Sequence, residues 1–180
     1  DAVSDHLSIY SDQVRIGQDA TPYQRGLPHI LPPLRTGFDA VITDLPRAML
    51  MQHATVADHL DALVLVIPAG FAGVNAATRL IERIKAQAPD LRILPVLSQL
   101  RRDAGLSPKD IASTIGHDII ATLPRCDAPL MRAQRAARAM VQHQPRSPYA
   151  KSVGTVWSAV LADRETESTP RKPLLKRMFR

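Results

Sequence analysis

The sequence predicts an α/β protein with a mostly parallel sheet and helices on both of its faces. Short apolar runs alternate along the chain with helical patterns of roughly ten to seventeen residues, joined by short links. The runs at residues 40–42 and 62–67 are apolar and rich in β-branched residues, which is typical of strands buried in a parallel sheet. Strands separated by helices need crossover connections, and these connections make neighbouring strands parallel.

The composition is that of one globular domain. The chain has 180 residues, of which 45% are hydrophobic and 22% are charged, so it can build a core of its own. No apolar run approaches the roughly 18 residues that a membrane span needs, and the N-terminus lacks a signal-peptide pattern. We therefore expect a cytoplasmic protein. Cys126 is the only cysteine, which excludes an internal disulfide and a thiolate metal cluster.

The positive charge is unevenly placed along the chain. The formal net charge is +6, and residues 164–180 supply six Lys or Arg against two Glu, which leaves seventeen against fifteen for residues 1–163. A basic chain would otherwise favour nucleic acid as a partner, but most of this basicity belongs to the tail. We therefore divide the chain into a body, residues 1–163, and a tail, residues 164–180.

The first elements of the body are weakly patterned. Strands are expected at residues 7–10 and 14–16. A helix is expected at residues 23–36, but its three prolines remove backbone donors and clash with the preceding turn, so it should be irregular or broken.

The stretch 38–46 is the centre of the predicted chemistry. Its residues 40–42 should form an interior strand, and Pro46 ends the pairing. Asp44 falls where this strand ends, and ligands of open parallel sheets bind beyond the carboxyl ends of the strands. Its carboxylate can therefore face Mg²⁺, a phosphate or an attacking water. The alternative is that Asp44 simply caps the next helix, as Asp often does.

The next elements predict one crossover unit. A helix is expected at residues 47–59, followed by a strand at 60–67 that should be buried on both faces. A helix at 72–88 repeats apolar residues at three- and four-residue spacing, and a third strand is expected at 91–97.

The rest of the body continues the pattern. Ser107 should N-cap a helix that has Pro108 and Asp110 in its first turn and stops at Gly116. The remaining predicted elements are a strand at 118–123, a helix at 127–142 and a helix at 149–162. The side chains of these two helices expected to face the core are Leu130, Ala133, Ala137, Met140, Val141, Val153, Val156, Trp157 and Val160.

Motifs for phosphate binding and hydrolysis are missing. A phosphate-binding loop needs closely spaced glycines and a Lys, yet no Gly-Lys pair occurs in the chain. The segment Gly70-Phe71-Ala72-Gly73 lies between a strand and a helix, as an anion site would, but it has no Lys and no third Gly. A plain turn that starts the helix is the other interpretation. No signature of a Ser or Cys hydrolase occurs.

Several segments, in order, resemble the second half of a ParA/MinD-type ATPase. These segments are Phe38-Asp39-Ala40-Val41-Ile42-Thr43-Asp44-Leu45-Pro46-Arg47, Ala62-Leu63-Val64-Leu65-Val66, Arg79-Leu80, Pro95-Val96-Leu97-Ser98-Gln99 and Ile120-Ala121-Thr122-Leu123-Pro124. The match covers about residues 5–162. Its Asp-Leu-Pro-Arg version is most similar to TadZ and CpaE, pilus-assembly proteins that help to place the Tad/Flp pilus machine in the bacterial cell.

The resemblance implies a P-loop NTPase-like partial domain and roles for four residues. Asp44 takes the position of the acid that follows the Walker B-type strand and that supports the Mg²⁺ of ATP indirectly. Ser98, Gln99 and Pro124 occupy nucleotide-binding positions. The match departs from the family at Ser98, where an Asn is usual, and at Arg125-Cys126-Asp127.

The family's phosphate-binding loop would lie upstream of these residues, so we expect a fragment of a longer protein or a degenerate relative. ATP and Mg²⁺ are the cofactors of the intact family, and this chain alone should bind ATP weakly and not hydrolyse it. The resemblance implies a positioning factor that forms a homodimer and works with pilus and secretion machinery. The alternatives are a ParA-like DNA-partitioning ATPase, although the nearly neutral body makes DNA an unlikely partner, and an inactive interaction domain.

The tail combines a polar linker with a basic amphipathic end. Residues 165–170 contain no large apolar side chain, which predicts a flexible linker. If Pro173 starts a helix, its apolar face and its basic residues suit the inner surface of an anionic membrane, and the segment is similar to the C-terminal membrane-targeting helix of MinD. The predicted membrane-contact residues are Leu174, Leu175, Lys176, Arg177, Met178 and Phe179. A solvated tail or a strip that docks on a partner protein remains the alternative.

Overall fold

The computed structural model describes residues 2–4, 7–10, 19, 21–98 and 105–162. It divides into two compact units, Asp1–His59 and Leu60–Arg180. No helix of the described residues is both long and apolar enough to cross a membrane. The predicted strand at 14–16, the nucleotide-binding position Gln99 and the whole tail lie outside the described residues.

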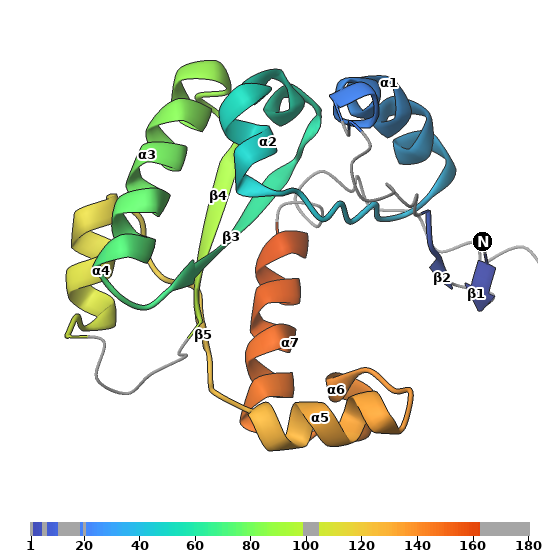
Figure 1. Cartoon of the computed structure of the whole chain (residues 1–180), viewed down its shortest axis with the longest axis vertical. Coiled ribbons are helices and arrows are strands. Elements are labelled where there is room, and N and C mark those ends of the chain that lie inside the picture. The colour runs from blue at the N-terminus through green and yellow to red at the C-terminus, as the bar shows by residue number, and fades with distance from the viewer. Residues whose placement is uncertain (1, 5–6, 11–18, 20, 99–104, 163–180) are drawn as a thin grey trace, which may run out of the picture. The chain divides into compact units, whose positions relative to one another are not determined.

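The first unit consists of a short hairpin and three helical segments (Figure 1). Its elements are β1 (Ala2–Ser4), β2 (Leu7–Ser8), α1 (Thr21–Gly37), α2 (Arg47–Gln52) and the 3₁₀ helix η1 (Ala54–His59). Strands β1 and β2 pair antiparallel. The two helical segments α2 and η1 replace the single helix expected at 47–59. The buried side chains of this unit are Leu31, Met49, Leu50, Ala54, Val56 and Ala57.

Helix α1 is continuous, so of the irregular or broken helix expected at 23–36, the break is wrong. Its seventeen residues include Pro28, Pro32 and Pro33. Each proline lacks the N–H that would bond the carbonyl four residues earlier. Pro32 and Pro33 leave the carbonyls of Pro28 and His29 unpaired, and because neither of these residues is buried, water can reach their carbonyls and the helix persists.

The stretch 38–46 forms no strand, which corrects the prediction for residues 40–42. Phe38 is 47% exposed and Ile42 is 82% exposed. β-Branched side chains favour strands through packing against neighbours on a half-buried surface. No described strand pairs with this stretch, so its apolar side chains gain no packing from a neighbouring strand.

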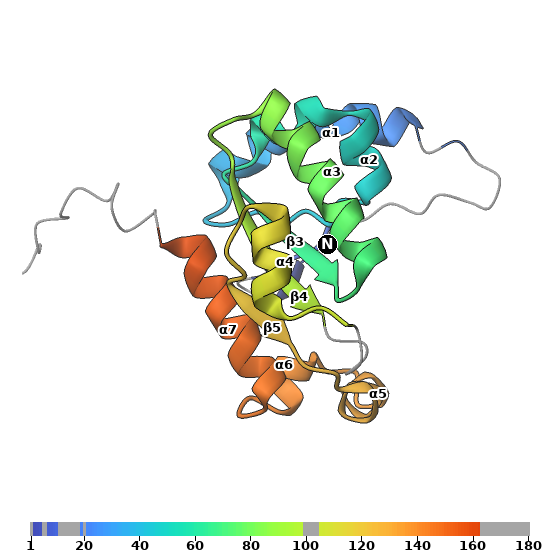
Figure 2. The ribbon, with the colours of Figure 1, turned by 90° about the vertical axis from the view of Figure 1, so that its left-hand side faces the viewer.

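The second unit is built on a three-stranded parallel sheet, and this confirms the α/β fold class. The strands are β3 (Ala62–Pro68), β4 (Arg92–Ser98) and β5 (Ala121–Leu123), in the order β3-β4-β5. Helices α3 (Phe71–Gln87) and α4 (Pro108–Ile115) provide the crossovers and lie on one side of the sheet, whereas α7 (Pro148–Leu161) lies on the other (Figure 1). Figure 2 shows α3 and α4 from their own side.

The central strand β4 forms the core of this sheet. Its five residues from Ile93 to Leu97 are all buried. One of them is Pro95, which cannot donate to a ladder but accepts a hydrogen bond from the N–H of Ile120 at 3.0 Å. The pairing between β4 and β5 begins only after this residue, so the missing donor breaks no strand ladder.

Strand β3 is buried on one face only, and the prediction of burial on both faces is wrong. Leu63 and Ile67 are buried, but Val64 is 36% exposed and Val66 is 52% exposed. The reason is the position of α7, which packs mainly against β5 and β4.

Helix α7 is held near both of its ends. The Ser152 hydroxyl donates to the Thr122 carbonyl at 2.9 Å, and Nη2 of Arg92 donates to the Ala159 carbonyl at 2.6 Å. Arg92 thereby serves one of the last carbonyls of the helix, which have no partner inside it. Trp157, predicted to face the sheet, is instead 41% exposed.

Helices α3 and α4 follow the sequence closely. The buried side chains of α3 are Val74, Ala77, Leu80, Ile81 and Ile84. Ser107 N-caps α4 as predicted, since its Oγ accepts from the Asp110 N–H at 3.2 Å, while Oδ2 of Asp110 accepts from the Ser107 N–H at 3.1 Å. The Ser107 hydroxyl also donates to Oδ2 of Asp110. This hydrogen bond, followed by the one from the Ser107 N–H, lowers the pKa of Asp110. Gly116 ends the helix with φ 69°.

The helix predicted at 127–142 is two helices, α5 (Asp127–Arg135) and α6 (Met140–His143). Ala137 has φ 49°, and the N–H of Arg138 bonds the carbonyl of Ala133 at 3.0 Å. Together with the bond from the Ala137 N–H to the Gln134 carbonyl at 2.9 Å, this is a Schellman motif in which alanine takes the usual place of glycine. Ala133 and Met140 are buried as predicted, whereas Leu130 and Ala137 are exposed.

A close approach at the start of α3 makes Gly73 indispensable, and we predict that Gly73→Ala destabilises the second unit. A Cβ at Gly73 would overlap the carbonyl oxygen of Pro68 at the end of β3. Overpacking of this kind costs about 1–3 kcal/mol. The measurement is denaturant-induced unfolding followed by circular dichroism.

Gly154→Ala in α7 is the matched control. A Cβ at that position meets no atom within 4 Å, and replacing glycine by alanine inside a helix should stabilise it by up to about 1 kcal/mol. Equal stability of Gly73→Ala and wild type would contradict the prediction.

Candidate functional site

The carboxyl ends of the three parallel strands meet at one edge of the sheet, and this edge is the candidate site. The strand register places Pro68 beside Ser98, and Ser98 beside Leu123. The N–H of Ala69 donates to the Ser98 carbonyl at 3.1 Å, which joins the turn after β3 to the end of β4. In open parallel sheets, ligands bind outside this edge.

Two of the predicted nucleotide-binding residues lie at this edge. Ser98 is the last residue of β4, and Pro124 directly follows β5. Both are partly exposed. Their nucleotide-binding role remains a prediction, as does that of Gln99.

The turn before α3 starts the helix and offers no side chain to a ligand. Gly70 is the N-cap residue with φ 137°, and no side chain caps the helix. The Gly70 carbonyl accepts from the N–H of Val74 at 3.0 Å, as in an ordinary first helical turn. Phe71 is 74% exposed. The segment Gly70-Phe71-Ala72-Gly73 therefore begins helix α3, as both interpretations of it imply.

In the segment after Pro124, Arg125 and Asp127 form an ion pair with each other. Nε of Arg125 donates to Oδ2 of Asp127 at 2.6 Å, and both side chains are largely exposed. Burial, and then the charge of Asp127, raise the pKa of the Cys126 thiol. Both effects favour the protonated thiol, which is a poorer nucleophile than the thiolate.

Asp44 belongs to the first unit, whereas Ser98 and Pro124 belong to the second. Its side chain is exposed. The N-cap residue of α2 is Pro46, whose carbonyl accepts from the Met49 N–H at 2.9 Å, and no side chain caps this helix. The interpretation of Asp44 as a helix cap is therefore wrong, and its role toward Mg²⁺ stays a prediction.

A site for Mg-ATP needs groups that bind the phosphates and groups that hold the metal ion. Phosphates need a cradle of backbone N–H groups and a Lys, and the turn at Gly70 has no basic side chain. No group of three or more His, Cys, Asp or Glu side chains in the described part of the chain is arranged to hold a metal ion.

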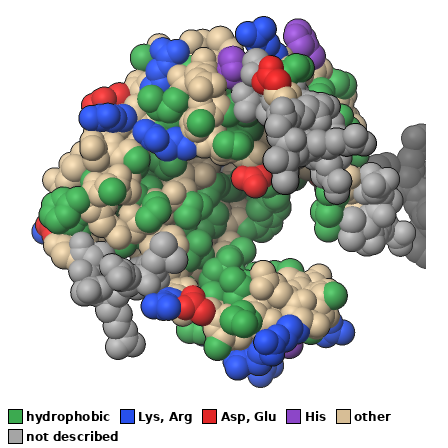
Figure 3. All heavy atoms as spheres, viewed as in Figure 1, with side chains coloured by type: hydrophobic (Ala, Val, Ile, Leu, Met, Phe, Trp, Pro, Cys, Tyr) green, Lys and Arg blue, Asp and Glu red, His purple; other side chains and the backbone are tan. Residues whose placement is uncertain are grey.

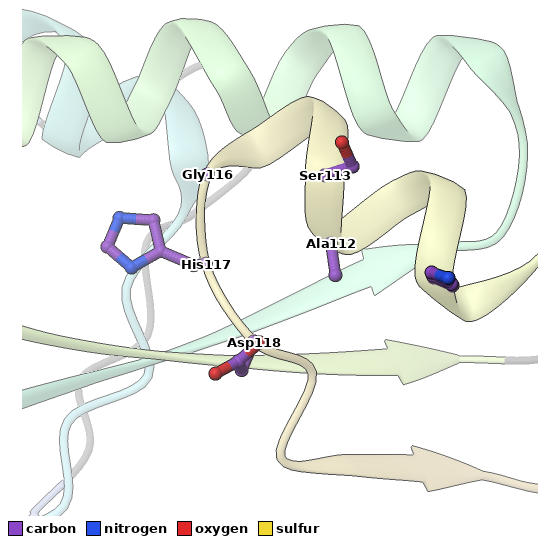
Figure 4. Close-up of a pocket in the computed structure, with 6 residues that line it drawn as sticks. Ala112, Ser113, Gly116, His117 and Asp118 are labelled. Atoms are coloured by element: carbon purple, nitrogen blue, oxygen red, sulfur yellow. The ribbon is translucent and has the colours of Figure 1, made fainter.

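A shallow hollow of about 390 Å³ lies elsewhere, beside α4 and the loop that leads to β5 (Figure 4). It is lined by Lys109, Ala112, Ser113, Gly116, His117 and Asp118. Because His117 and Asp118 precede β5, the hollow faces the amino end of that strand, away from Ser98 and Pro124. The side chains of Ser113, His117 and Asp118 do not converge (Figure 4). The sequence contains no signal for this hollow, since helical spacing of polar residues is equally typical of any exposed helix face.

The sequence matches no protein-family model and no curated protein. Three solved structures are similar in fold. A ParA family ATPase from Chlorobium tepidum TLS matches with a TM-score of 0.51 and 14% identity, over 86% of this chain and 78% of that one. The MinD cell division protein of Aquifex aeolicus matches with a TM-score of 0.59 and 15% identity, over 86% of this chain and 64% of that one.

The third structure is the septum site-determining protein MinD of Pyrococcus horikoshii OT3, complexed with Mg-ADP. It matches with a TM-score of 0.61 and 15% identity, over 87% of this chain. The present chain spans only 62% of its length. At these identities the likeness concerns the fold. The chain therefore has the α/β fold of the ParA/MinD ATPases, and its candidate site is the carboxyl edge of a partial sheet of that fold.

Proposed function

We propose that the chain belongs to a TadZ/CpaE-like pilus-assembly protein, a positioning factor built on the ParA/MinD ATPase fold. The observation that carries the proposal is the combination of this fold with the segment Asp44-Leu45-Pro46-Arg47. The candidate edge of the sheet has little of the chemistry that phosphoryl transfer needs. Placement of other proteins therefore suits these residues better than turnover does.

In this proposal, the nucleotide and the metal ion are bound by the whole protein. ATP and Mg²⁺ are the proposed cofactors, and Asp44 would support the Mg²⁺ through a water molecule. One protein of similar fold holds Mg-ADP. In this chain, Ser98, Gln99 and Pro124 would line the side of the nucleotide that is remote from the phosphates.

The proposed partners follow from the proposed pilus-assembly function. We expect a homodimer that contacts pilus and secretion proteins on the cytoplasmic side of the inner membrane. The tail would add contact with anionic lipid through Leu174, Leu175 and Phe179 and through its neighbouring basic residues.

The 180-residue chain should bind Mg-ATP no more tightly than about 1 mM, because phosphate binding lacks a Lys and an N–H cradle. Isothermal titration calorimetry measures this affinity directly. A micromolar dissociation constant would contradict the prediction.

In a longer form that carries a phosphate-binding loop, Asp44→Ala should abolish Mg²⁺-dependent hydrolysis and leave the circular dichroism spectrum unchanged.

Deleting the gene should reduce the number of Tad/Flp pili on the bacterial cell, and the intact gene should restore it. The physical reason is that an unplaced pilus machine cannot assemble at its site. Electron microscopy of pili and the position of a fluorescent fusion are the measurements. Normal piliation after deletion, or a defect in DNA partitioning alone, would overturn the pilus assignment.

The tail should increase binding to anionic vesicles, because each basic residue near an anionic surface contributes on the order of 1 kcal/mol. Co-sedimentation compares the intact chain with one that ends at Pro170, on anionic and on neutral vesicles. If both chains bind equally, the tail is not a membrane anchor.

A further inference from the structure

The segment that contains α5 and α6 concentrates positive charge outside the tail. Residues 125–151 contain six Lys or Arg and a single acid, Asp127. That acid is already ion-paired with Arg125. This local excess of +5 exceeds the net charge of +2 carried by residues 1–163 together. Figure 3 shows basic side chains gathered over this region, at the lower edge of the view.

Four arginines of the segment are exposed and, among the described residues, form no ion pair. They are Arg132, Arg135, Arg138 and Arg146. Unpaired, exposed guanidinium groups remain available to an external anion, and they form up to five hydrogen bonds each.

The fold aims these groups outward. Ala133 is fully buried and Met140 is 5% exposed, so one side of α5 and α6 is anchored in the second unit. At 100° per residue, Met131, Arg132 and Arg135 fall within an arc of about 100° on the opposite side of α5. The Schellman motif at Ala137 then turns the chain sharply, which sets Arg138 directly after this exposed face.

One apolar side chain lies on the same exposed face. Met131 is 53% exposed and falls inside this arc, whereas Leu130, at 39% exposed, lies about 60° from the buried Ala133. A surface that only attracts phosphate groups through charge has no use for an exposed methionine. An anionic lipid surface uses both kinds of group, because cations lie among the headgroups while apolar side chains enter the acyl boundary.

We propose that the surface formed by Met131, Arg132 and Arg135 of α5 and by Arg138 between α5 and α6 binds an anionic lipid surface. We call it the α5–α6 surface. It is separate in sequence from the tail at residues 164–180. It does not depend on the proposed pilus function. Two weak contacts on one chain would bind together more tightly than either alone.

The test uses the full chain, so that the contribution of the tail stays constant. Arg132→Gln/Arg135→Gln removes two charges from the α5–α6 surface. Arg79→Gln/Arg83→Gln removes two exposed charges from α3 and is the matched control. Vesicles of phosphatidylglycerol and phosphatidylcholine, and vesicles of phosphatidylcholine alone, are the probes.

Each basic residue near an anionic membrane raises the affinity about fivefold. The α5 double variant should therefore lose about 10- to 30-fold in partitioning to the anionic vesicles, whereas the α3 double variant should change by about twofold or less. Met131→Ser should weaken binding by a few fold, also at high salt, because it removes an apolar and not an ionic contact. All variants are exposed substitutions, and unchanged thermal unfolding checks that they fold.

Four results would overturn the proposal. The first is a wild-type chain that does not bind anionic vesicles. The second is an equal loss in the two double variants, which would mean that only the net charge matters. The third is an α5 double variant that loses retention of double-stranded DNA and keeps vesicle binding, which would assign the surface to nucleic acid. The fourth is a loss of vesicle binding in the chain that lacks the tail but not in the α5 double variant, which would leave the tail as the anchor and reject the α5–α6 surface.

Discussion

The parallel ladder around β4 is the constraint on which the second unit depends. Five consecutive buried residues make this strand apolar on both faces, so its backbone groups must find partners in neighbouring strands. Parallel pairing with β3 and β5 satisfies them and requires crossover helices. The same pairing brings Pro68, Ser98 and Leu123 to one edge. The candidate site is thus a consequence of how the core is built.

That edge has the geometry of a ligand site with little of its chemistry. Gly73 allows α3 to begin almost in contact with Pro68, and the hydrogen bond from Ala69 to Ser98 ties the turn to the sheet. Arg125 and Asp127 form an ion pair with each other, and burial favours the protonated form of the Cys126 thiol. A precisely built edge of this kind also suits the proposed role, in which the protein holds partners in place.

The distribution of charge is more informative than its sum. Residues 1–163 are nearly neutral overall, yet the segment 125–151 is strongly basic, because acids elsewhere in the body offset it. At a screening length of roughly 8–10 Å, a partner senses the local excess and not the total. The buried Ala133 sets Arg132 and Arg135 on the exposed side of α5, and the Schellman motif at Ala137 ends the helix just before Arg138.

Local patterns in the sequence were enough to determine the α/β class, strands β3 and β4, helix α3 and the capping box of α4. Each of these depends on periodicity or on hydrogen bonds between residues close in sequence. Only the tertiary structure decided that residues 40–42 remain unpaired, that α7 leaves Val64 and Val66 exposed, and that an alanine ends α5. These features depend on which segments pack together, and a β-branched run or an Ala-rich helix has the same local preference whether or not a partner covers it.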